Sequence, residues 1–432
     1  MSNCSPYKKA RSIGPNEMEN LTYQDLKSAV DGEAVALRSR LQLQPIGGPG
    51  DKVYPPTYSV DGQPEHKYVV EERQVGEAES TTTTVLLDSV ASQANRAEMA
   101  LLEGWEGGEL LFPVPYVDFS DSNLTDYEKL TVLEAPHRIA DAIFRDSLLD
   151  GTLFRLSDIG QAITDATPRN ATDLFRFSPS ALLFGMWDST GPKGGLGSKF
   201  QRAYVSEIVG FDAKPGKKVG SRLDPLQIEK VATEDRAFNS TDPSEVWTFD
   251  STQAEVDKKG APKYASRGSD SGEAGQPSKI NHGNIVPSID SQAGGVTISS
   301  ALQTTVISFA ALRRLRFKGY SEDAQLAART AVAALGVAAI AYQIELDFDL
   351  RSRCLLVPSH QPKLELVSRN GAESEAFAVD RAQSAEILRQ ASDHADRVGL
   401  RWESREIRLS PAPKLLELIR RSRKVSLSES EG

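Results

Sequence analysis

The stretch that most constrains the fold runs from Ala324 to Ile344, where apolar residues surround a helix on nearly every side. Ser321 precedes this stretch as an N-cap, and a helix that is apolar all round has to be buried. Its most apolar part, 331–342, is shorter than the roughly 20 residues that a membrane span needs. We therefore expect a core helix, packed on a sheet formed in part by 345–350 and 354–357.

Composition places the chain among ordinary globular proteins. It has 432 residues, 39% hydrophobic and 25% charged, with a net charge of −10. Cys4 and Cys354 are too few for a zinc cluster or a disulfide framework, and the five histidines show no metal-binding pattern. The N-terminal residues lack the apolar region of a secretory signal. These features predict a cytoplasmic protein with no cofactor, no metal and no membrane role.

Positive charge is concentrated in one part of this acidic chain. Residues 191–222 hold seven Lys or Arg against two carboxylates, a local balance of +5. The loop around Lys193 contains Gly191, Gly194, Gly195 and Gly197, and glycines let a backbone approach a phosphate closely. A basic groove on an acidic surface suits RNA or another polyanion, whereas the alternative is a solvated loop followed by a lysine-rich linker.

The glycine loop does not match the motifs that bind mononucleotides or dinucleotides. Counted from Gly191, the second glycine of a Walker A loop would fall on Leu196, and Lys199 is followed by Phe200 rather than Ser or Thr. Phe200 also stands where a G-x-G-x-x-G pattern starting at Gly195 needs its third glycine. ATP and NAD binding therefore have little support.

Two further segments offer polar side chains suited to RNA. Gln93, Asn95 and Arg96 fall in the first turn of a helix predicted over 92–102, where free N–H groups favour a phosphate; a polar turn facing solvent is the alternative. In the Gly- and Asn-rich loop that begins at Lys279, the side chains of Asn281, His282 and Asn284 can hydrogen-bond base edges or 2′-hydroxyl groups; the alternative is a turn that satisfies its own backbone.

Hydrophobic periodicity and turn signals give the rest of the organisation. The expected elements are helical spacing over 21–41, a hairpin of 53–60 with 67–75, a strand at 82–90, a helix over 135–149, a buried strand at 182–187, an irregular insertion at 216–278, a helix over 384–398, a strand at 402–409, a helix near 414–421 and a disordered tail at 424–432.

Several segments, in order, resemble one known family. They are IGGPGDKVYPPTY, DSVASQANRAEMALL, HRIADAIFRD, SALLFGMWDSTGPKGGLGSKFQRAYVSEIVGFDA, KINHGNIVPSI and GGVTIS. Over roughly residues 40–360, the chain resembles the large backbone subunit of the subtype I-G CRISPR Cascade complex, formerly called subtype I-U.

The resemblance implies an α+β fold, namely an elaborated RRM-like (ferredoxin-like) RAMP palm with large insertions, extending over 1–432 as one domain. It implies a protein that polymerises head to tail along a CRISPR guide RNA, meets other Cascade subunits and faces the target DNA strand through the guide. It implies no enzyme activity. The hairpin at 45–76 is our candidate for the thumb that reaches over the guide in such subunits.

The residues that we expect to bind RNA are Gln93, Asn95, Arg96, Arg138, Arg169, Arg176, Trp187, Lys193, Gly194, Gly195, Lys199, Arg202, Lys279, Asn281 and His282. For Arg138 an ion pair with Glu134, Asp141 or Asp146 is the default expectation, and the resemblance adds RNA or the neighbouring subunit as a contact. Trp187 either stacks on a base or packs in the core, with packing the expected outcome. The alternative function is a metal-dependent RAMP endoribonuclease, with Asp165, Asp173 or Asp188 as its candidate aspartate.

Overall fold

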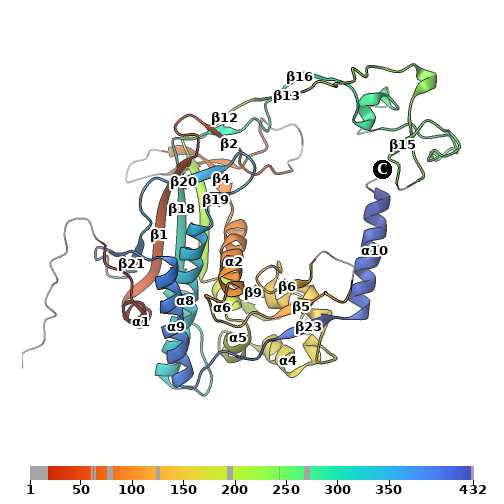
Figure 1. The fold of residues 1–432 in the computed structure, drawn as a ribbon. Coiled ribbons are helices and arrows are strands. Elements are labelled where there is room, and N and C mark those ends of the chain that lie inside the picture. Colours follow the sequence, from red (N-terminus) through yellow and green to blue (C-terminus); the bar gives the residue numbers. More distant parts are fainter. Residues whose placement is uncertain are drawn as a thin grey trace, which may run out of the picture.

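The computed structural model describes residues 18–59, 62, 65–74, 81–122, 127–191, 198–242, 244–266 and 273–429. In this part of the chain a nine-stranded antiparallel sheet forms the centre of the molecule (Figure 1). Its main path runs β19-β20-β1-β18-β11-β4-β3, with β21 beside β1 and β22 beside β21. The strands are β1 (Ala34–Pro45), β3 (Val70–Gln74), β4 (Thr81–Asp88), β11 (Tyr204–Phe211), β18 (Ser300–Ser308), β19 (Phe348–Asp349), β20 (Leu355–Pro358), β21 (Leu364–Ser368) and β22 (Glu375–Phe377).

The middle of this sheet has the topology of an RRM-like palm. The strands β20, β1, β18 and β11 are neighbours in that order. Helix α2 (Val90–Glu106) lies between β1 and β11 in sequence, and α8 (Glu322–Glu345) lies between β18 and β20. The result is a β-α-β-β-α-β unit, and the predicted α+β class is confirmed.

Helix α8 is the centre of the hydrophobic core. Ser321 caps it by accepting a hydrogen bond from the Ala324 N–H, as predicted, and nearly all of its side chains are buried. Gly336 lets the helix approach the sheet, because a Cβ there would lie 2.7 Å from Ile307 Cδ1. In the described chain α8 is the one helix long and apolar enough to cross a membrane, and 89% of that window is buried in the protein.

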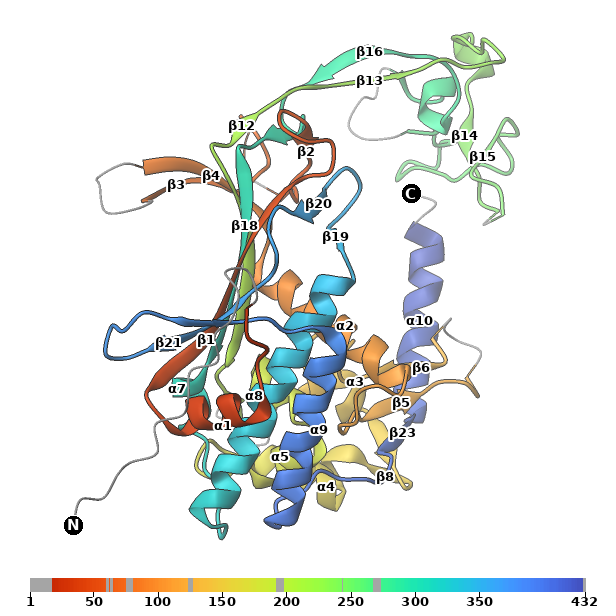
Figure 2. The ribbon, with the colours of Figure 1, turned by 60° about the vertical axis from the view of Figure 1, so that its left-hand side comes forward.

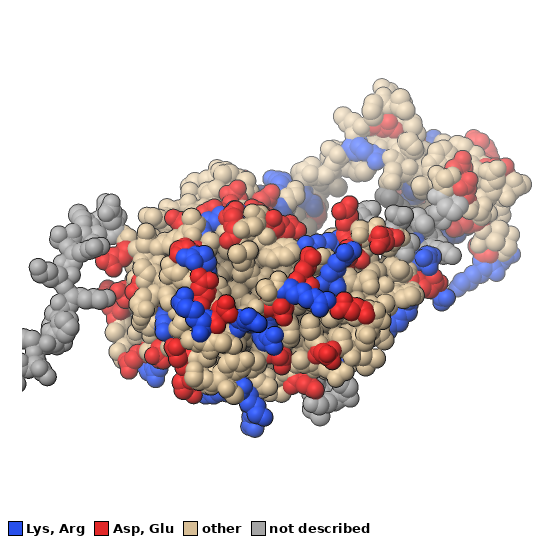
Figure 3. Space-filling view, turned by 60° about the horizontal axis from the view of Figure 1, so that its bottom comes forward, with Lys and Arg blue, Asp and Glu red and all other residues tan. Residues whose placement is uncertain are grey.

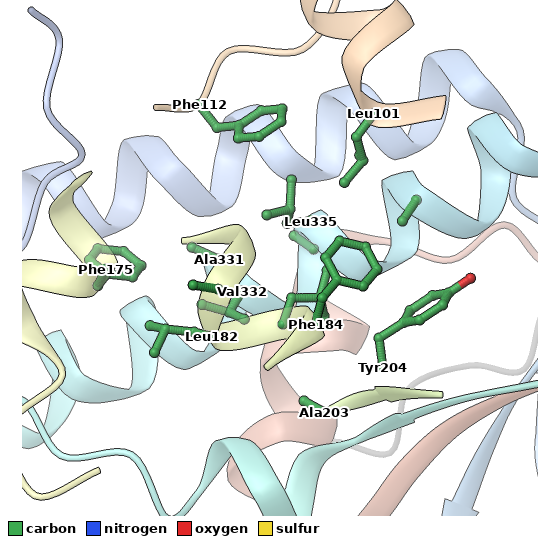
Figure 4. Close-up of a cluster of buried hydrophobic side chains, with 14 of the residues drawn as sticks. Leu101, Phe112, Phe175, Leu182, Phe184, Ala203, Tyr204, Ala331, Val332 and Leu335 are labelled. Carbon is green, nitrogen blue, oxygen red and sulfur yellow. The ribbon is translucent and has the colours of Figure 1, made fainter. Parts of the chain in front are cut away.

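Other helices pack around α8 and close the core. Figures 1 and 2 show α2, α8 and α9 on one side of the sheet, and Figure 4 shows Leu335 and Val332 of α8 near Leu182 and Phe184. The helices are α1 (Tyr23–Asp31), α6 (Ser180–Phe184), α7 (Phe309–Leu312) and α9 (Arg381–Arg397).

A smaller five-stranded sheet lies below the palm and carries the last helix. Its order is β6-β5-β23-β7-β8, and short helices pack around it. The elements are β5 (Tyr116–Asp118), β6 (Lys129–Thr131), η1 (Arg138–Ala140), α3 (Ala142–Arg145), β7 (Ser147–Leu149), β8 (Thr152–Leu153), η2 (Phe154–Leu156), α4 (Asp158–Asp165), α5 (Thr172–Phe177), β23 (Arg408–Pro411) and α10 (Pro413–Glu429). Between this part and the palm, β9 (Met186–Trp187) pairs with β10 (Lys199–Phe200).

Between β11 and β18 the chain leaves the palm as a long arm, residues 212–299, which Figure 2 shows reaching away from the sheet. The arm begins where β17 pairs with β12 and β2, continues as the two-stranded β13–β16 ribbon and ends in a small irregular tip. Its elements, with β2, are β2 (Lys52–Val53), β12 (Lys214–Pro215), β13 (Lys218–Arg222), η3 (Thr233–Asp235), β14 (Phe238–Asn239), β15 (Trp247–Thr248), η5 (Pro277–Ile280), β16 (Ile285–Asp290) and β17 (Val296–Thr297).

The hairpin predicted from 53–60 and 67–75 is wrong. Lys52–Val53 pairs with Val296–Thr297, and Val70–Gln74 pairs with β4. One backbone hydrogen bond, from the Tyr58 N–H to the Lys67 carbonyl, joins the two expected strands. The error arises because the partners of both runs come from elsewhere in the sequence.

Four other local predictions are also corrected. The helical spacing over 21–41 holds only through α1, since the chain turns at Gly32 and continues as β1. The predicted strand at 182–187 is mostly helix α6, and the predicted helix over 135–149 is divided into η1, α3 and β7. Helix α10 continues to Glu429, so the tail expected from 424 is helical up to that residue.

Candidate nucleic-acid interface

One cleft of about 560 Å³ collects several of the side chains expected to bind RNA, and we call it the groove. The start of α2 forms one wall, and the β9–β10 pair with the residues after it forms the other. Its lining residues are Ala91, Ala94, Asn95, Pro136, His137, Arg138, Phe184, Gly185, Met186, Trp187, Lys199, Phe200, Gln201, Arg202 and Tyr204.

Trp187 and Lys199 stand opposite each other on the β9–β10 pair. The Trp187 side chain is 54% exposed, and Lys199 Nζ lies 5.4 Å from the centroid of its ring. The expectation that Trp187 packs in the core is therefore wrong. An exposed indole beside a cation offers a stacking surface for a base and a charge for a phosphate.

Gly185 fixes the bend of the chain at the back of the groove. Its φ is +85°, and a Cβ at this position would lie 2.9 Å from the Arg202 backbone nitrogen. Only glycine combines that conformation with so close an approach. The bend separates buried Phe184 from exposed Trp187 and leaves Arg202 exposed at the groove.

Asn95 and His137 add hydrogen-bonding groups to the same surface. Asn95 is exposed, but α2 begins at Val90 after the N-cap Ser89, so Asn95 lies in the second turn and not in the first turn that was predicted. His137 is exposed just before η1. Sequence reasoning missed His137 and Gln201 as groove residues, although His137 adjoins the predicted Arg138.

Gln93, in contrast, lies in the interior of the protein, where a ligand does not reach it. It is fully buried, and its Oε1 accepts hydrogen bonds from Ser206 (3.0 Å), Gln303 (2.8 Å) and Gln343 (3.1 Å). Its Nε2 donates to Asp88 Oδ2 over 2.7 Å. Every side-chain atom that could bind RNA is occupied, so its prediction as an RNA ligand is wrong.

Arg96 is engaged at the same buried carboxylate. Its Nε donates to Asp88 Oδ2 over 3.0 Å, and its Nη2 donates to the Leu350 carbonyl. Arg351 holds the other oxygen of Asp88 over 3.0 Å. Because Asp88 is fully buried, losing either arginine would leave part of its charge unpaired. The Arg96 guanidinium is therefore engaged by partners within the palm and is not available as a free cation at the groove.

Arg138 lies behind the groove wall and supports it. Its Nε and Nη2 donate to the two oxygens of Glu98 over 2.6 and 2.9 Å, and its Nη1 donates to the Gly185 carbonyl over 3.1 Å. Burial raises the pKa of Glu98 to about 7, against the lowering effect of the Arg138 charge. An ion pair was the default expectation for Arg138, but its partner is Glu98 and not Glu134, Asp141 or Asp146. The pair connects α2 to the bend at Gly185.

The remaining predicted residues that the structure describes lie outside the groove. Arg169 is exposed on the turn at 167–170, and Arg176 lies 3.7 Å from Glu403 and over the ring of Phe177. On the arm, Asn281 adopts a φ of +62° after η5, with Lys279 and His282 beside it. Lys193, Gly194 and Gly195 lie outside the described residues.

A second cleft, of about 610 Å³, separates 111–114 from 401–407. Four carboxylates line it, against two arginines, so its charge does not suit a polyanion. Figure 3 shows that basic and acidic side chains alternate over the lower face of the molecule. Among the residues that the structure describes, this face therefore has no extended basic surface, and a polyanion would find favourable charge only at small separate sites.

Residues 37–215 match the model of a family described as CRISPR-associated protein GSU0053. This segment of the chain is therefore similar to that CRISPR-associated family. It covers β1, α2, the β9–β10 pair and β11, and therefore every wall of the groove. No curated protein matches the chain.

Proposed function

We propose that this chain is a CRISPR-associated protein that binds guide RNA along its sugar-phosphate backbone and polymerises head to tail as the backbone of a type I-G Cascade surveillance complex. The observation that carries the proposal is the groove, where an exposed Trp187 stands beside Lys199 with Arg202 on the same wall. The CRISPR family match of the segment that builds the groove supports it.

The groove chemistry favours binding without sequence readout. Cations contact phosphates, which are the same at every nucleotide, and an indole ring stacks on any base. Asn95 and His137 supply groups able to meet the 2′-hydroxyl that distinguishes RNA from DNA. A strand held in this way leaves its base edges exposed for pairing with a target DNA strand.

The arm supports the polymerisation part of the proposal. Its β13–β16 ribbon exposes Val219 (71%), Val286 (79%) and Ile289 (71%), with Leu223 and Leu226 exposed just beyond β13. A two-stranded ribbon is marginally stable on its own, and a cluster of exposed apolar side chains marks a contact surface. We propose that the arm packs on the next copy. A head-to-tail contact of this kind builds an open helix.

RNA binding is tested with the full chain and a groove variant, Trp187→Ala with Lys199→Gln and Arg202→Gln. The wild-type protein is expected to purify with RNA and to bind single-stranded RNA of unrelated sequences with similar affinity. The groove variant is expected to lose most of that affinity. A control, Arg420→Gln with Arg421→Gln, removes two exposed charges on α10 and is expected to bind normally. RNA-free wild-type protein that also binds no added RNA contradicts the proposal.

Assembly is tested by light scattering and electron microscopy in the presence of RNA. Val219→Asp with Ile289→Asp is expected to give monomers on RNA in place of filaments. Leu418→Asp changes a comparably exposed apolar residue on α10 and serves as the control. Filaments formed equally by both variants would show that the ribbon is not a subunit contact.

The alternative, a metal-dependent endoribonuclease, predicts RNA cleavage that depends on a divalent cation and on one aspartate. Asp188 is buried and paired with Arg155 over 2.5 Å, which makes it a poor metal ligand. Asp165 and Asp173 remain to be tested by Asp→Asn substitution. We propose that the chain is a binding subunit, and RNA that stays intact with Mg²⁺ or Mn²⁺ is the expected result.

A further inference from the structure

We propose that the RNA path continues beyond the groove onto a second phosphate-binding surface formed by Arg169, Arg314, Arg316 and Lys318. We call this surface the ledge. The inference rests on the proposed RNA-binding function, since it assigns residues outside the groove to the same strand of RNA. The occupant is the segment of single-stranded RNA that flanks the nucleotides held at Trp187.

The ledge is joined directly to the groove. Arg314 Nη1 donates to Gln201 Oε1 over 2.9 Å, and Gln201 lines the groove beside Arg202. The turn that carries Arg169 is fixed on the other side, where the Arg316 N–H donates to the Pro168 carbonyl over 2.9 Å. The ledge therefore adjoins the groove at Gln201 and Arg202. An RNA strand that leaves the groove there passes directly onto the ledge.

The ledge is also held rigidly from beneath. Leu315 and Phe317 are buried, so the residues that alternate with them, Arg314, Arg316 and Lys318, are exposed. Phe317 packs edge-on against Phe175 with ring centroids 5.6 Å apart. Alternation along a fixed segment places the three cations on the outside of the protein, where a strand can reach them.

The neighbouring arginines show what a structural role looks like in this region. Arg313 donates to the carbonyls of Ala29, Val30, Gly32 and Ala34, and so caps the end of α1. Arg329 donates to the Leu315 carbonyl. Burial lowers the pKa of both arginines. By contrast, in the described chain the Arg314 side chain makes one hydrogen bond, to Gln201, and the Lys318 side chain makes none.

The charge of the ledge is not neutralised within the described residues. None of its four cations lies within ion-pair distance of a carboxylate there, whereas Arg96, Arg138 and Arg155 each have one. Arg316 donates to the carbonyls of Arg313 and Leu315, which leaves its charge uncompensated. Like charges held close together repel each other, and a polyanion laid across them relieves that repulsion.

The experiment measures the affinity of the full chain for single-stranded RNA of about 4 to about 16 nucleotides at several salt concentrations. The ledge variant carries Arg314→Gln, Arg316→Gln and Lys318→Gln. Its matched control carries Arg420→Gln, Arg421→Gln and Arg423→Gln on α10, three exposed charges on another element. A second variant, Arg314→Gln with Lys318→Gln, keeps the backbone contacts of Arg316.

For the shortest RNA, the ledge variant is expected to bind within about twofold of the wild type. For the longest RNA, the slope of log affinity against log salt is expected to be shallower by about 2, since each neutralised phosphate contributes about 0.7. The two-residue variant is expected to change the slope by about 1.4. The α10 control is expected to follow the wild type at every length.

Two results would overturn the inference. If the ledge variant binds RNA of every length like the wild type, RNA does not reach the ledge; loss of self-association in that variant would then assign the surface to a contact with another copy of this acidic chain. If the shortest RNA already loses as much as the longest, the ledge is part of the groove itself. Failure of the proposed function is distinct, because the wild type would then bind no RNA at any length.

Discussion

Two polar regions adjoin α2, and they differ in what their side chains contact. At the buried region, Gln93, Arg96 and Arg138 hold Asp88 and Glu98. At the groove wall, Trp187, Lys199 and Arg202 have no carboxylate partner in the described chain and are exposed. Residue type is thus a poor guide to ligand binding until the internal partners of each side chain are known.

The largest effect is expected where a buried charge loses its partner. Glu98→Ala leaves the Arg138 guanidinium, whose side chain is only 15% exposed, without a carboxylate. At pH 8 the free energy of unfolding is expected to fall by about 3–5 kcal/mol, measured by urea denaturation. Glu417→Ala removes an exposed carboxylate that contacts two arginines on α10, and should cost less than about 1 kcal/mol. Equal losses in both variants would contradict the distinction between the two regions.

The next effect concerns pH at the same pair. The pKa of Glu98 is raised to about 7 in the folded protein, so the folded state binds a proton that the unfolded chain releases near its ordinary value. The contribution of Glu98 to stability is present below about pH 4.5 and is lost as pH rises through 7, an order of about 3 kcal/mol. Glu98→Gln does not titrate. Comparing the two proteins from pH 5 to pH 8 should show the wild type losing stability relative to the variant.

At the groove wall we expect an effect on binding and little on folding. Trp187→Ala should weaken RNA binding by about 1–3 kcal/mol, because the stacking surface is lost. Since the side chain is half exposed, the free energy of unfolding should change by less than about 1 kcal/mol. Trp187→Phe keeps an aromatic face and should retain most of the affinity. A large loss of stability in Trp187→Ala would show that the Trp187 ring contributes to the hydrophobic core.

The smallest expected effect is on the salt dependence of RNA binding, and it compares one cation from each region. Lys199→Gln should reduce the salt slope of RNA binding by about 0.7, the contribution of one phosphate contact. Arg96→Gln should leave that slope unchanged, because the Arg96 guanidinium is directed to Asp88 and to the Leu350 carbonyl. Titrations of both variants at matched salt concentrations measure the difference. A reduced slope for Arg96→Gln would mean that this arginine also contacts RNA.

The parts of the fold that were predictable from sequence are those set by local pattern. The cap at Ser321 and the all-round apolar character of α8 need only neighbouring residues, and both predictions are confirmed. The run at 182–187 was assigned to a strand because a short apolar run looks the same in a buried helix. The structure resolves it as α6 followed by a bend at Gly185.

The groove was only partly predictable, for a related reason. The sequence identified Lys199, Arg202, Asn95 and Trp187 by residue type, and the structure brings them to one cleft. It gave no indication that the Gln93 side chain would be hydrogen-bonded to residues 113, 210 and 250 positions away in the sequence. Long-range partners of this kind follow from the sheet register, which no local pattern encodes.

The position of the arm has a consequence for how such a protein can vary. The arm departs from β11 and returns through β18, two strands that pair with each other along their length. Residues added to or removed from the arm would therefore alter how far it reaches while the register of the palm stays the same. In the proposed assembly, where the arm contacts the next copy, the spacing between successive subunits on RNA would be adjustable independently of the surface that binds each nucleotide.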